Sequence, residues 1–494
     1  MVNPRKLWLA FDIGTTGLKT ALVAPDGEIV RSAYRTYATR TADGGVMEQN
    51  ALDWWAAAIE ASKELAKSDD FNRVEAIALT GQMQDLILVD EKGNPVHPVI
   101  LYSDTRARTE AEGIIRRIGV ERLRSLTGND QDASSLLAKL LWLKLQQPKV
   151  LESARYLFLG AADFLALKLT GVATTDTTTA STTGLMDLGT RAVLDLAVLE
   201  EIGVGEAYQL LPKITTGGAK VGVLSEAAAK AFGLKAGTPV HHGPGDAGAT
   251  TLGAGSGEAG PVYGYLGTSG WIAFTSPGRA LPDQGAITLA HPKQTYYIQV
   301  APLLTAGRNL EWVRDLFGSD DYEKLIEKAL QAEPSHLIYL PYLNGERSPF
   351  RDPLARGAFV GLNGRTTKAD LYRAVLEGVV NSYRHSLNAL LILPATTMML
   401  TGGGTRSQAW CQLFADIANV PVAVAVDAEN VGVRGAVLAA QVSLGELESY
   451  NPSGYFPVKV TLQPNAKHRE RYDQKYQLFR DTYPALKPIF GKMV

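Results

Sequence analysis

Short apolar runs separated by small-residue turns dominate the beginning of the chain. The run KLWLAFDIG ends at Gly14, and a second run, GLKTALV, begins at Gly17 after Thr15 and Thr16. Two apolar runs around such a turn predict a pair of strands, and the letters PDGE mark a second turn into a third strand, EIVRSAYRTY. The chain is therefore expected to begin as an antiparallel meander.

Segments with helical spacing follow this meander. The periodicity is clear in NALDWWAAAIEASKELAK, in DTRARTEAEGIIRRIG and in ASSLLAKLLWLKLQQ. Trp54 and Trp55 are expected to pack in the core, with stacking on a ligand as the alternative. Between these helices, a short strand is predicted by VEAIALTG, which ends at Gly81, and a hairpin by LILVDEKGNPV.

The second half of the chain repeats this plan. A strand, a Gly/Thr/Ser turn and a strand recur in GPVYGYLGTSGWIAFTS (260–276), and TTMMLTGGG predicts a strand that ends in three glycines. An amphipathic helix follows in SQAWCQLFADIAN. The Gly-rich stretch 241–260 lies between the two halves. We therefore expect a mixed α/β protein of two related domains, residues 1–245 and 246–494.

Bulk composition narrows the class of protein. A chain of 494 residues is too long for one core, and 46% apolar and 20% charged residues are ordinary for a folded protein. The net charge of −2 gives no basis for nucleic-acid or membrane binding. No signal peptide or membrane span is expected, and with Cys411 as the single cysteine a cytoplasmic location is predicted. The Thr-rich stretch 170–184 is expected to be a polar loop or an edge hairpin.

The two small-residue turns have the chemistry of phosphate-binding loops. A turn of Gly, Thr and Ser exposes backbone N–H groups without bulky side chains in the way, and its hydroxyls add donors. One such turn alone is most often an ordinary hairpin turn. Two related turns that face each other across a cleft would bind opposite sides of a polyphosphate, so the sequence predicts a nucleotide between the two halves.

A carboxylate beside the first turn suits a metal ion. Asp12 ends the first strand and could hold Mg²⁺ through waters, with a turn-initiating role as the alternative. Lys19 either contacts a phosphate oxygen or faces solvent. In TGGGTRSQAW, Gly402–Gly404 allow close approach of a flat ligand, and the helix that starts near Ser407 offers free N–H groups, so an adenosine moiety fits there.

Five stretches occur in a characteristic order over about residues 7–440: FDIGTTGLKTALV, GPGDAGAT, YLGTSGW, LPYLNGERSPFRDPLARGAFVGL and LTGGGTRSQAWCQLFADI. Together they resemble the FGGY carbohydrate kinases and, among these, the xylulokinases. The resemblance implies an α/β fold with two ribonuclease-H-like (actin-like ATPase) domains flanking a catalytic cleft. It implies ATP and Mg²⁺ as cofactors, and ATP and a small sugar as partners. The helix segment SSLLAKLLWLK departs from the family at Leu136, where a small residue or proline is usual.

The resemblance also implies roles for individual residues. Asp246, in GPGDAGAT, is implied to be the general base that takes the proton from the acceptor hydroxyl, with a helix N-cap as the alternative. Within the implied nucleotide site, Glu311 has a helix-surface charge as its alternative. The implied ATP contacts are Thr15, Thr16, Lys19, Gly267, Thr268, Gly307, Glu311, Gly403 and Ser407.

The sugar side departs from the family pattern. Xylulokinases commonly carry Met-His-Gly after the Gly-Gln pair, whereas this chain reads GQMQD. Gln82, Met83 and Gln84 are the candidate sugar contacts, and Gln84 puts an amide where the family has a titratable ring. Asp104, in YSDTRA, is a further candidate, with a helix-start role as its alternative, and Asp246 completes the set. D-xylulose is therefore expected first, with D-ribulose, another pentulose, a polyol or a sugar acid as alternatives.

Two other classes of protein share part of this pattern. An actin-like filament or Hsp70-like ATP-driven protein would use the phosphate loops but not the sugar-side stretches. The tail HRERYDQKYQLFRDTYPALKP predicts one helix rather than a peptide-binding domain. A catalytically dead sugar sensor would not need both Asp12 and Asp246. The sequence leaves the oligomeric state open, with a homodimer as one option.

Overall fold

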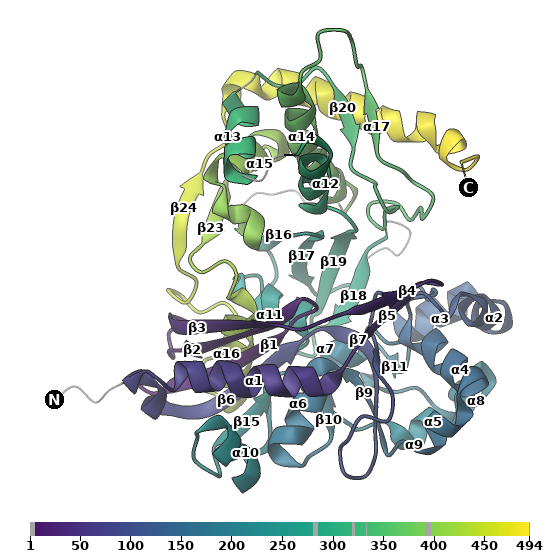
Figure 1. Cartoon of the computed structure of the whole chain (residues 1–494), viewed down its shortest axis with the longest axis vertical. Coiled ribbons are helices and arrows are strands. Elements are labelled where there is room, and N and C mark those ends of the chain that lie inside the picture. Colours follow the sequence, from purple (N-terminus) through teal and green to yellow (C-terminus); the bar gives the residue numbers. More distant parts are fainter. Residues whose placement is uncertain (1–4, 280–284, 319–321, 332, 391–396, 494) are drawn as a thin grey trace.

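The computed structural model describes residues 5–279, 285–318, 322–331, 333–390 and 397–493. Figure 1 shows two lobes, the lower formed mainly by the first half of the chain and the upper mainly by the second half. Each lobe is built around one mixed sheet with helices on its faces. Within the described ranges, no helix combines the length and the apolar character that crossing a membrane requires.

The first sheet has the strand order β14-β15-β6-β1-β2-β3. Its three central strands, β15, β6 and β1, are parallel, whereas β1, β2 and β3 form the predicted antiparallel meander. The bounds are β1 Leu7–Ile13, β2 Gly17–Val23, β3 Ile29–Thr36, β6 Val74–Gly81, β14 Ala219–Val223 and β15 Pro239–His242.

The second sheet repeats the first strand by strand. It has the order β24-β23-β22-β16-β17-β19-β18, in which β23, β22 and β16 are parallel and the flanking strands are antiparallel, as in the first sheet. Only β18 lies beyond the shared pattern. This correspondence confirms the internal repeat predicted from the two hairpins. The bounds are β16 Val262–Leu266, β17 Gly270–Ser276, β18 Ile287–Ala290, β19 Tyr297–Leu303, β22 Met398–Thr401, β23 Val422–Ala425 and β24 Val458–Leu462.

Strand β1 shows how the sequence pattern places the first carboxylate. Its odd-numbered residues, from Leu7 to Ile13, join the core under α1 and α6, whereas Trp8 and Ala10 join a second core under α16. A strand covered on both faces is apolar at nearly every position. Asp12 is the exception, and it lies at the carboxyl end of the strand. The covering helices are α1 Ala51–Leu65, α6 Ala161–Thr170 and α16 Val431–Leu444.

The two lobes exchange helices at their junction. Helix α11 (Asp246–Gly253) follows β15 of the first sheet, yet Ala247 lies in the core of the second sheet with Tyr263 and Ala273. Helix α16 follows β23 of the second sheet but packs on the first. The two helices also pack directly against each other. The exchange joins the lobes where the strand ends of both sheets meet.

A smaller sheet, β4-β5-β8-β7-β9, extends the first lobe on the sugar-binding side predicted from the sequence. Its strand β7 continues directly from β6 of the main sheet after Gln82. Helices α2 to α5, α8 and α9 surround it with a separate hydrophobic core. The bounds are β4 Arg40–Ala42, β5 Val46–Gln49, β7 Met83–Val89, β8 Val99–Ile100, β9 Tyr156–Gly160, α2 Arg108–Ile118, α3 Val120–Thr127, α4 Leu136–Gln146, α5 Pro148–Glu152, α8 Leu196–Ile202 and α9 Ala207–Leu210.

Several helices pack around the second sheet. Helix α14 begins with a capping box, in which the Thr367 hydroxyl accepts from the Asp370 backbone N–H and the Asp370 carboxylate accepts from the Thr367 N–H. The tail forms the single helix predicted for it. The bounds are α12 Arg308–Phe317, α13 Tyr322–Gln331, α14 Lys368–Ala389, α15 Gln408–Ala418 and α17 Arg469–Phe490. The short strands β20 Ile338–Leu340 and β21 Ala358–Val360 pair with each other, and β20 packs beside α14 and α17. Helix α10, Glu226–Phe232, belongs to the first lobe.

The Thr-rich stretch 170–184 is not the exposed polar segment that the sequence predicts. It forms β10 (Thr174–Asp176) and α7 (Thr177–Ala180), and every residue of both elements is buried. Asp176 caps α7 by accepting from the backbone N–H groups of Thr178 and Thr179. The hydroxyls of Thr178 and Thr179 donate to Ala290 O and to Asp176, whereas those of Thr174, Thr175 and Thr177 are buried without a partner among the described residues. The polarity of the stretch was therefore a poor guide to its exposure.

Candidate active site

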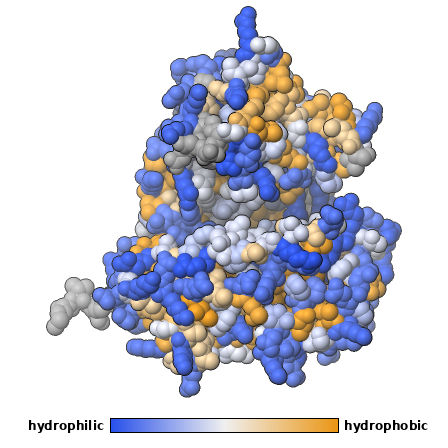
Figure 2. Space-filling view, in the orientation of Figure 1, coloured by the Kyte–Doolittle hydropathy of each residue, from blue (hydrophilic) through white to orange (hydrophobic). Residues whose placement is uncertain are grey.

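The carboxyl ends of the parallel strands in both sheets face the space between the lobes. Asp12 lies at the end of β1, Gln82 follows β6, and Asp246 follows β15, whereas Gly267 and Gly402 follow β16 and β22 of the second sheet. Ligands of open α/β sheets bind outside the carboxyl ends of parallel strands. Figure 2 shows the surface hollowed between the two lobes at this level. These five residues therefore lie at the strand ends that face one cleft.

Asp246 is the first residue of α11. The N-cap position is taken by Gly245, so the alternative of Asp246 as the N-cap is wrong. One carboxylate oxygen, Oδ1, accepts from the backbone N–H of Ala247 at 2.7 Å. Burial, and next the charge of Asp12, raise the pKa of Asp246 to about 7. A carboxylate with such a pKa is a stronger base than an ordinary aspartate near neutral pH.

Asp12 is enclosed by three neighbours. Lys19 stands opposite it in the register of β1 and β2, and burial raises the pKa of Asp12 while the charge of Lys19 opposes the rise. A Cβ atom at Gly432, in the first turn of α16, would lie 2.6 Å from Asp12 Oδ2 and 3.8 Å from the Thr250 hydroxyl. Only glycine leaves room for the carboxylate at this helix.

The chemistry at Asp12 fits Mg²⁺ rather than a metal held by protein alone. No group of three or more His, Cys, Asp or Glu side chains gathers at one point in the described residues. Mg²⁺ is usually held by one or two carboxylates together with waters and substrate phosphates. A single aspartate beside a phosphate loop matches that pattern.

Hydrogen bonds to its backbone hold the first small-residue turn in place. Its backbone closes through a Gly14 N–H donated to Gly17 O at 3.1 Å, and the Tyr37 hydroxyl donates to Gly14 O. The Gln49 amide donates to Thr15 O at 2.7 Å. Thr15 is partly exposed and Thr16 is exposed. Their hydroxyls lie 3.3 Å from the Tyr102 and Tyr34 hydroxyls, respectively, so a ligand would share or replace these weak contacts.

The second turn is held by the start of α12. Gly307 donates its N–H to Gly267 O at 2.8 Å, and Arg308 donates to Thr268 O at 3.0 Å. A Cβ atom at Gly307 would lie 2.7 Å from Gly267 O, so the contact requires glycine. Glu311 lies one turn along the same helix and is half-buried. The structure thus brings the predicted Gly267, Thr268 and Gly307 together.

The glycine triplet lies against the second turn. Cβ atoms at Gly402 and Gly404 would approach Leu266 within 2.8 and 2.6 Å, whereas one at Gly403 would meet open space. Ser407 caps α15 by accepting from the Trp410 N–H at 3.3 Å. Gly403 is therefore the open position of the triplet, and the Ser407 hydroxyl already serves as a helix cap.

Tyr265, on β16 of the second lobe, lies near enough to Asp12 and Asp246 for their charges to affect its pKa. It precedes Gly267 on β16 and stacks on Trp271 with ring centroids 3.9 Å apart. Burial raises the pKa of its phenol, the charge of Lys19 opposes the rise, and the charges of Asp12 and Asp246 add to it. Asp12, Lys19 and Asp246 therefore lie within electrostatic range of the strand that leads into the second turn.

The predicted sugar contacts line the junction of β6 and β7. Gln82 is buried and donates to Gln49 Oε1 at 3.0 Å. Met83 abuts the backbone just before the predicted base, because a Cβ atom at Gly245 would overlap the Met83 sulfur. Gln84 has a positive φ of 63°, a conformation that non-glycine residues seldom adopt and that clusters at functional sites.

Asp104 is placed differently from the other predicted sugar contacts. Its side chain has no exposed surface and accepts from the Met47 N–H at 2.6 Å and from the Arg106 N–H at 3.0 Å. The Arg106 guanidinium pairs with both its oxygens and with Glu48. The structure therefore engages Asp104 inside the small sheet, next to the site rather than open to it.

Sequence reasoning missed three buried polar residues around the site. Gln49 bridges Gln82 to the first phosphate loop, and Trp54 donates to the same amide at 3.0 Å. Asp85 and Lys139 are fully buried, although Lys139 lies within an apolar run and Asp85 directly precedes one. A charged residue inside an apolar run is a usable signal, because such residues are almost never fully buried without a partner.

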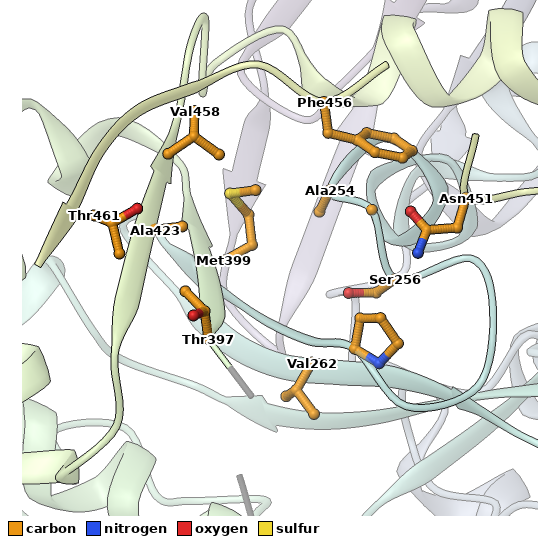
Figure 3. A pocket seen from close by; sticks show the side chains of 12 residues that line it. Ala254, Ser256, Val262, Thr397, Met399, Ala423, Asn451, Phe456, Val458 and Thr461 are labelled. Atoms are coloured by element: carbon orange, nitrogen blue, oxygen red, sulfur yellow. The ribbon is translucent and has the colours of Figure 1, made fainter. Parts of the chain in front are cut away.

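A separate pocket lies at the opposite end of the second sheet. Its volume is about 350 Å³, and Val262, Met399 and Ala423 line it from the starts of β16, β22 and β23. Figure 3 shows Phe456 and Asn451 closing it on one side. None of its lining residues is charged. The pocket therefore lies away from the carboxyl ends of the strands and is not part of the cleft.

Two repeated sheets flank a cleft, each with a small-residue turn between two of its strands, and Asp12 and Asp246 lie beside strands of the first sheet. This arrangement defines a protein with two actin-like ATPase domains. Two family models locate this chain within that class. The model of the N-terminal domain of the FGGY family of carbohydrate kinases matches residues 7–253, and that of the C-terminal domain matches residues 262–444. The chain belongs to the FGGY family of carbohydrate kinases.

Individual relatives agree with this assignment. The xylulose kinase of Staphylococcus xylosus is 29% identical over 487 residues, which cover 96% of this chain and 99% of that protein. The ligand-bound xylulose kinase of Lactobacillus acidophilus is 26% identical with a TM-score of 0.90, and the gluconate kinase of the same organism is 26% identical with a TM-score of 0.89; each comparison covers 99% of this chain and 100% of the other. The chain is therefore a carbohydrate kinase of xylulokinase-like type.

Proposed function

We propose that this kinase transfers the γ-phosphoryl group of ATP to a hydroxyl of a ketose, with D-xylulose as the first candidate. The observation that carries the proposal is Asp246, which stands at the start of α11 in the cleft with a pKa of about 7. The similarity to xylulose kinases over nearly the whole chain supports the choice of ketose. We also propose residues 1–245 and 246–494 as the two functional domains.

The proposed roles follow the placement of the residues. Asp246 takes the proton from the acceptor hydroxyl as the phosphoryl group is transferred. The turns around Thr15, Thr16, Gly267 and Thr268 hold the phosphates from opposite lobes, and Lys19 adds a positive charge beside Asp12. Gly307, Glu311, Gly403 and Ser407 line the adenosine side. Asp12 is the residue that would hold Mg²⁺, which neutralises phosphate charge when bound.

On the sugar side, we propose Gln82, Met83 and Gln84 as direct contacts. Asp104 is proposed to act from behind the site, because its carboxylate is already paired with Arg106 and Met47. Gluconate is the second candidate acceptor, since the gluconate kinase of Lactobacillus acidophilus is as similar in sequence and fold as the xylulose kinase.

The test is an ADP-release assay with a panel of ketoses, sugar alcohols and D-gluconate, together with a reaction that contains no acceptor. We expect D-xylulose to give the highest kcat/KM and ADP release to be minimal without sugar. A different best acceptor would replace xylulose, and sugar-independent turnover would favour an ATP-driven conformational protein.

The same assay tests the base. We expect Asp246→Asn to bind sugar and nucleotide normally but to lose about 10²–10⁴-fold in kcat, the usual contribution of general-base catalysis. Asp195→Asn is the matched control, because Asp195 is exposed and makes no capping bond at the start of α8. Turnover close to the wild-type value in Asp246→Asn would exclude this residue as the base.

A further inference from the structure

Asp85 is a buried carboxylate that the predicted sugar contacts leave unexplained. It follows Gln84 on β7, and its side chain has no exposed surface. Its Oδ1 accepts from the Tyr102 N–H at 3.0 Å, whereas its Oδ2 has no hydrogen-bond partner among the described residues. Leaving a buried acceptor unpaired is costly, and a native structure that does so usually awaits a water or a ligand.

The backbone around Asp85 is distorted in the way that functional strands often are. Gln84 has a φ of 63°, and the register of β7 against β9 shifts between Met83 and Ile87. A β-bulge of this kind redirects side chains and is common next to active sites. Burial raises the pKa of Asp85 and the charge of Lys139 opposes the rise, while the charge of Asp246 adds to it. Asp85 is thus within electrostatic range of the predicted base.

Two further acceptors near Asp85 are also free. Gln82 Oε1 and the Ser103 hydroxyl are buried without a partner in the described part of the chain. Ser103 follows the Tyr102 N–H that binds Asp85, and Gln82 precedes Asp85 by three residues on the same segment. An amide oxygen such as Gln82 Oε1 can only accept hydrogen bonds, and the same holds for the oxygens of an ionised carboxylate. Whatever occupies this site must therefore supply donors.

We propose that Asp85 is a specificity-determining residue of the acceptor site, which binds a hydroxyl of a neutral, polyhydroxylated acceptor and excludes aldonates. The inference rests on the proposed kinase function and deepens it. Hydroxyl groups of a ketose or sugar alcohol supply the donors that Asp85 and Gln82 need. The carboxylate of an aldonate supplies none, and the burial that raises the pKa of both Asp85 and Asp246 also disfavours a further negative charge at this place.

A purely structural role would make Asp85 only a counter-charge for Lys139. Lys139 is buried on α4 and donates to Leu101 O at 2.6 Å, with Asp85, Asp104 and Asp132 as nearby charges. Removing Asp85 alone would leave the buried ammonium with less compensation and so lower stability. The test therefore needs a variant in which both charges are removed.

The experiment measures acceptor affinity by calorimetry and steady-state constants for wild type, Asp85→Asn, and the double variant Asp85→Asn with Lys139→Gln. Asparagine keeps one oxygen for the Tyr102 N–H and places an amide N–H donor where Oδ2 stood, so it cannot accept a hydrogen bond from a sugar hydroxyl at that place. We expect the Kd of the best neutral acceptor to rise about tenfold or more in both variants. The KM for ATP should stay unchanged, and the preference over D-gluconate should fall.

The matched control is the double variant Glu377→Gln with Lys475→Gln, which removes a buried glutamate–lysine ion pair in the second lobe. It should lower the melting temperature without changing acceptor affinity. Wild-type acceptor affinity in Asp85→Asn, or its recovery in the Asp85–Lys139 double variant, would overturn the proposal. If the wild-type enzyme prefers another neutral acceptor, D-xylulose is excluded as the substrate but the role of Asp85 stands. If the wild-type enzyme prefers D-gluconate, the proposal that the site excludes aldonates is wrong.

Discussion

The buried ring of His242, near the cleft, is held in one protonation state by its two hydrogen-bond partners. His242, at the end of β15, has Nε2 2.8 Å from Asp163 Oδ1 and Nδ1 2.9 Å from Gly243 O. Both partners are acceptors, so both ring nitrogens must carry protons, and the ring is a buried cation. Burial alone would lower its pKa, but the hydrogen bond and charge of Asp163, with Asp176 adding, raise the pKa of His242 to about 9.

This cation makes stability depend on pH. A histidine whose pKa rises from 6.5 unfolded to about 9 folded stabilises the protein fully below pH 6.5 and loses that contribution as pH rises through 9. We expect a loss on the order of 3 kcal/mol in the free energy of unfolding across this window. Denaturant unfolding at several pH values checks it. The double variant Asp163→Asn with His242→Gln should lack this component, and equal pH slopes in the two proteins would contradict the prediction.

The glycine at position 432 gives a second prediction for a single residue. A methyl group there would lie 2.6 Å from Asp12 Oδ2, so Gly432→Ala must displace either the carboxylate or the start of α16. We expect a ten- to hundredfold loss of kcat/KM for MgATP, in line with the usual effect of small displacements at catalytic groups. Gly113→Ala on α2, where a Cβ atom meets open space, is the control and should keep full activity. Normal MgATP kinetics in Gly432→Ala would show that Asp12 tolerates the shift.

At the scale of whole elements, the crossing of α11 and α16 is the tightest packing in the junction. Cβ atoms built at Gly253 and Gly435 would overlap the backbone carbonyls of Val431 and Ala249, respectively. The backbones of the two helices therefore touch, and no side chain separates them. Such a contact transmits displacement between lobes, because closely packed interiors yield little.

Gly435→Ala tests this crossing. The added methyl group has no free volume, so we expect the free energy of unfolding to fall by about 1–3 kcal/mol, the typical cost of overpacking. Chemical denaturation of the variant and of the Gly113→Ala control measures the effect. A variant as stable as wild type would mean that α11 and α16 can separate without cost.

Local patterns predicted the elements well but not their partners. The sequence predicted the two strand–turn–strand hairpins, the long helices and the core position of Trp54. These features could be predicted because strand alternation and helical spacing are local signals. The packing of α16 on the sheet of the other half was not, because the same apolar face fits either sheet. Thr174 to Thr179 were misjudged since their burial depends on tertiary contacts and local hydrogen bonds.

The candidate site divides in the same way. Asp12 lies near the end of β1 and Asp246 begins α11, both within short characteristic sequence motifs, so their positions could be predicted. Gln49 and Asp85 acquire a role only through contacts with Gln82, Thr15 and Tyr102, which lie far away in sequence or across a bulge. Asp104 was chosen for its residue type, and only the structure reveals the arginine that engages it.

At the scale of the whole molecule, side chains bridge the two lobes on the sugar side. Arg351 of the second lobe donates to Asp130 at 3.2 Å and also pairs with Asp132 of the first lobe. Arg347 donates to the Ser134 hydroxyl at 3.2 Å. These contacts span the cleft, so they can form only while the lobes are close together.

A kinase must exclude water when the nucleotide is bound, or ATP would be hydrolysed instead of transferred. We therefore expect the sugar and a non-hydrolysable ATP analogue to lower the radius of gyration measured by small-angle scattering.

Because the ion pairs of Arg351 with Asp130 and Asp132 are partly exposed, Arg351→Ala should weaken sugar binding by no more than about fivefold. The decrease in radius of gyration on ligand binding should be smaller in the Arg351→Ala variant than in the wild type, and it should depend less on salt concentration. Arg365→Ala, at an exposed position before α14, is the control. A radius that is the same with and without ligands would show that the lobes do not close.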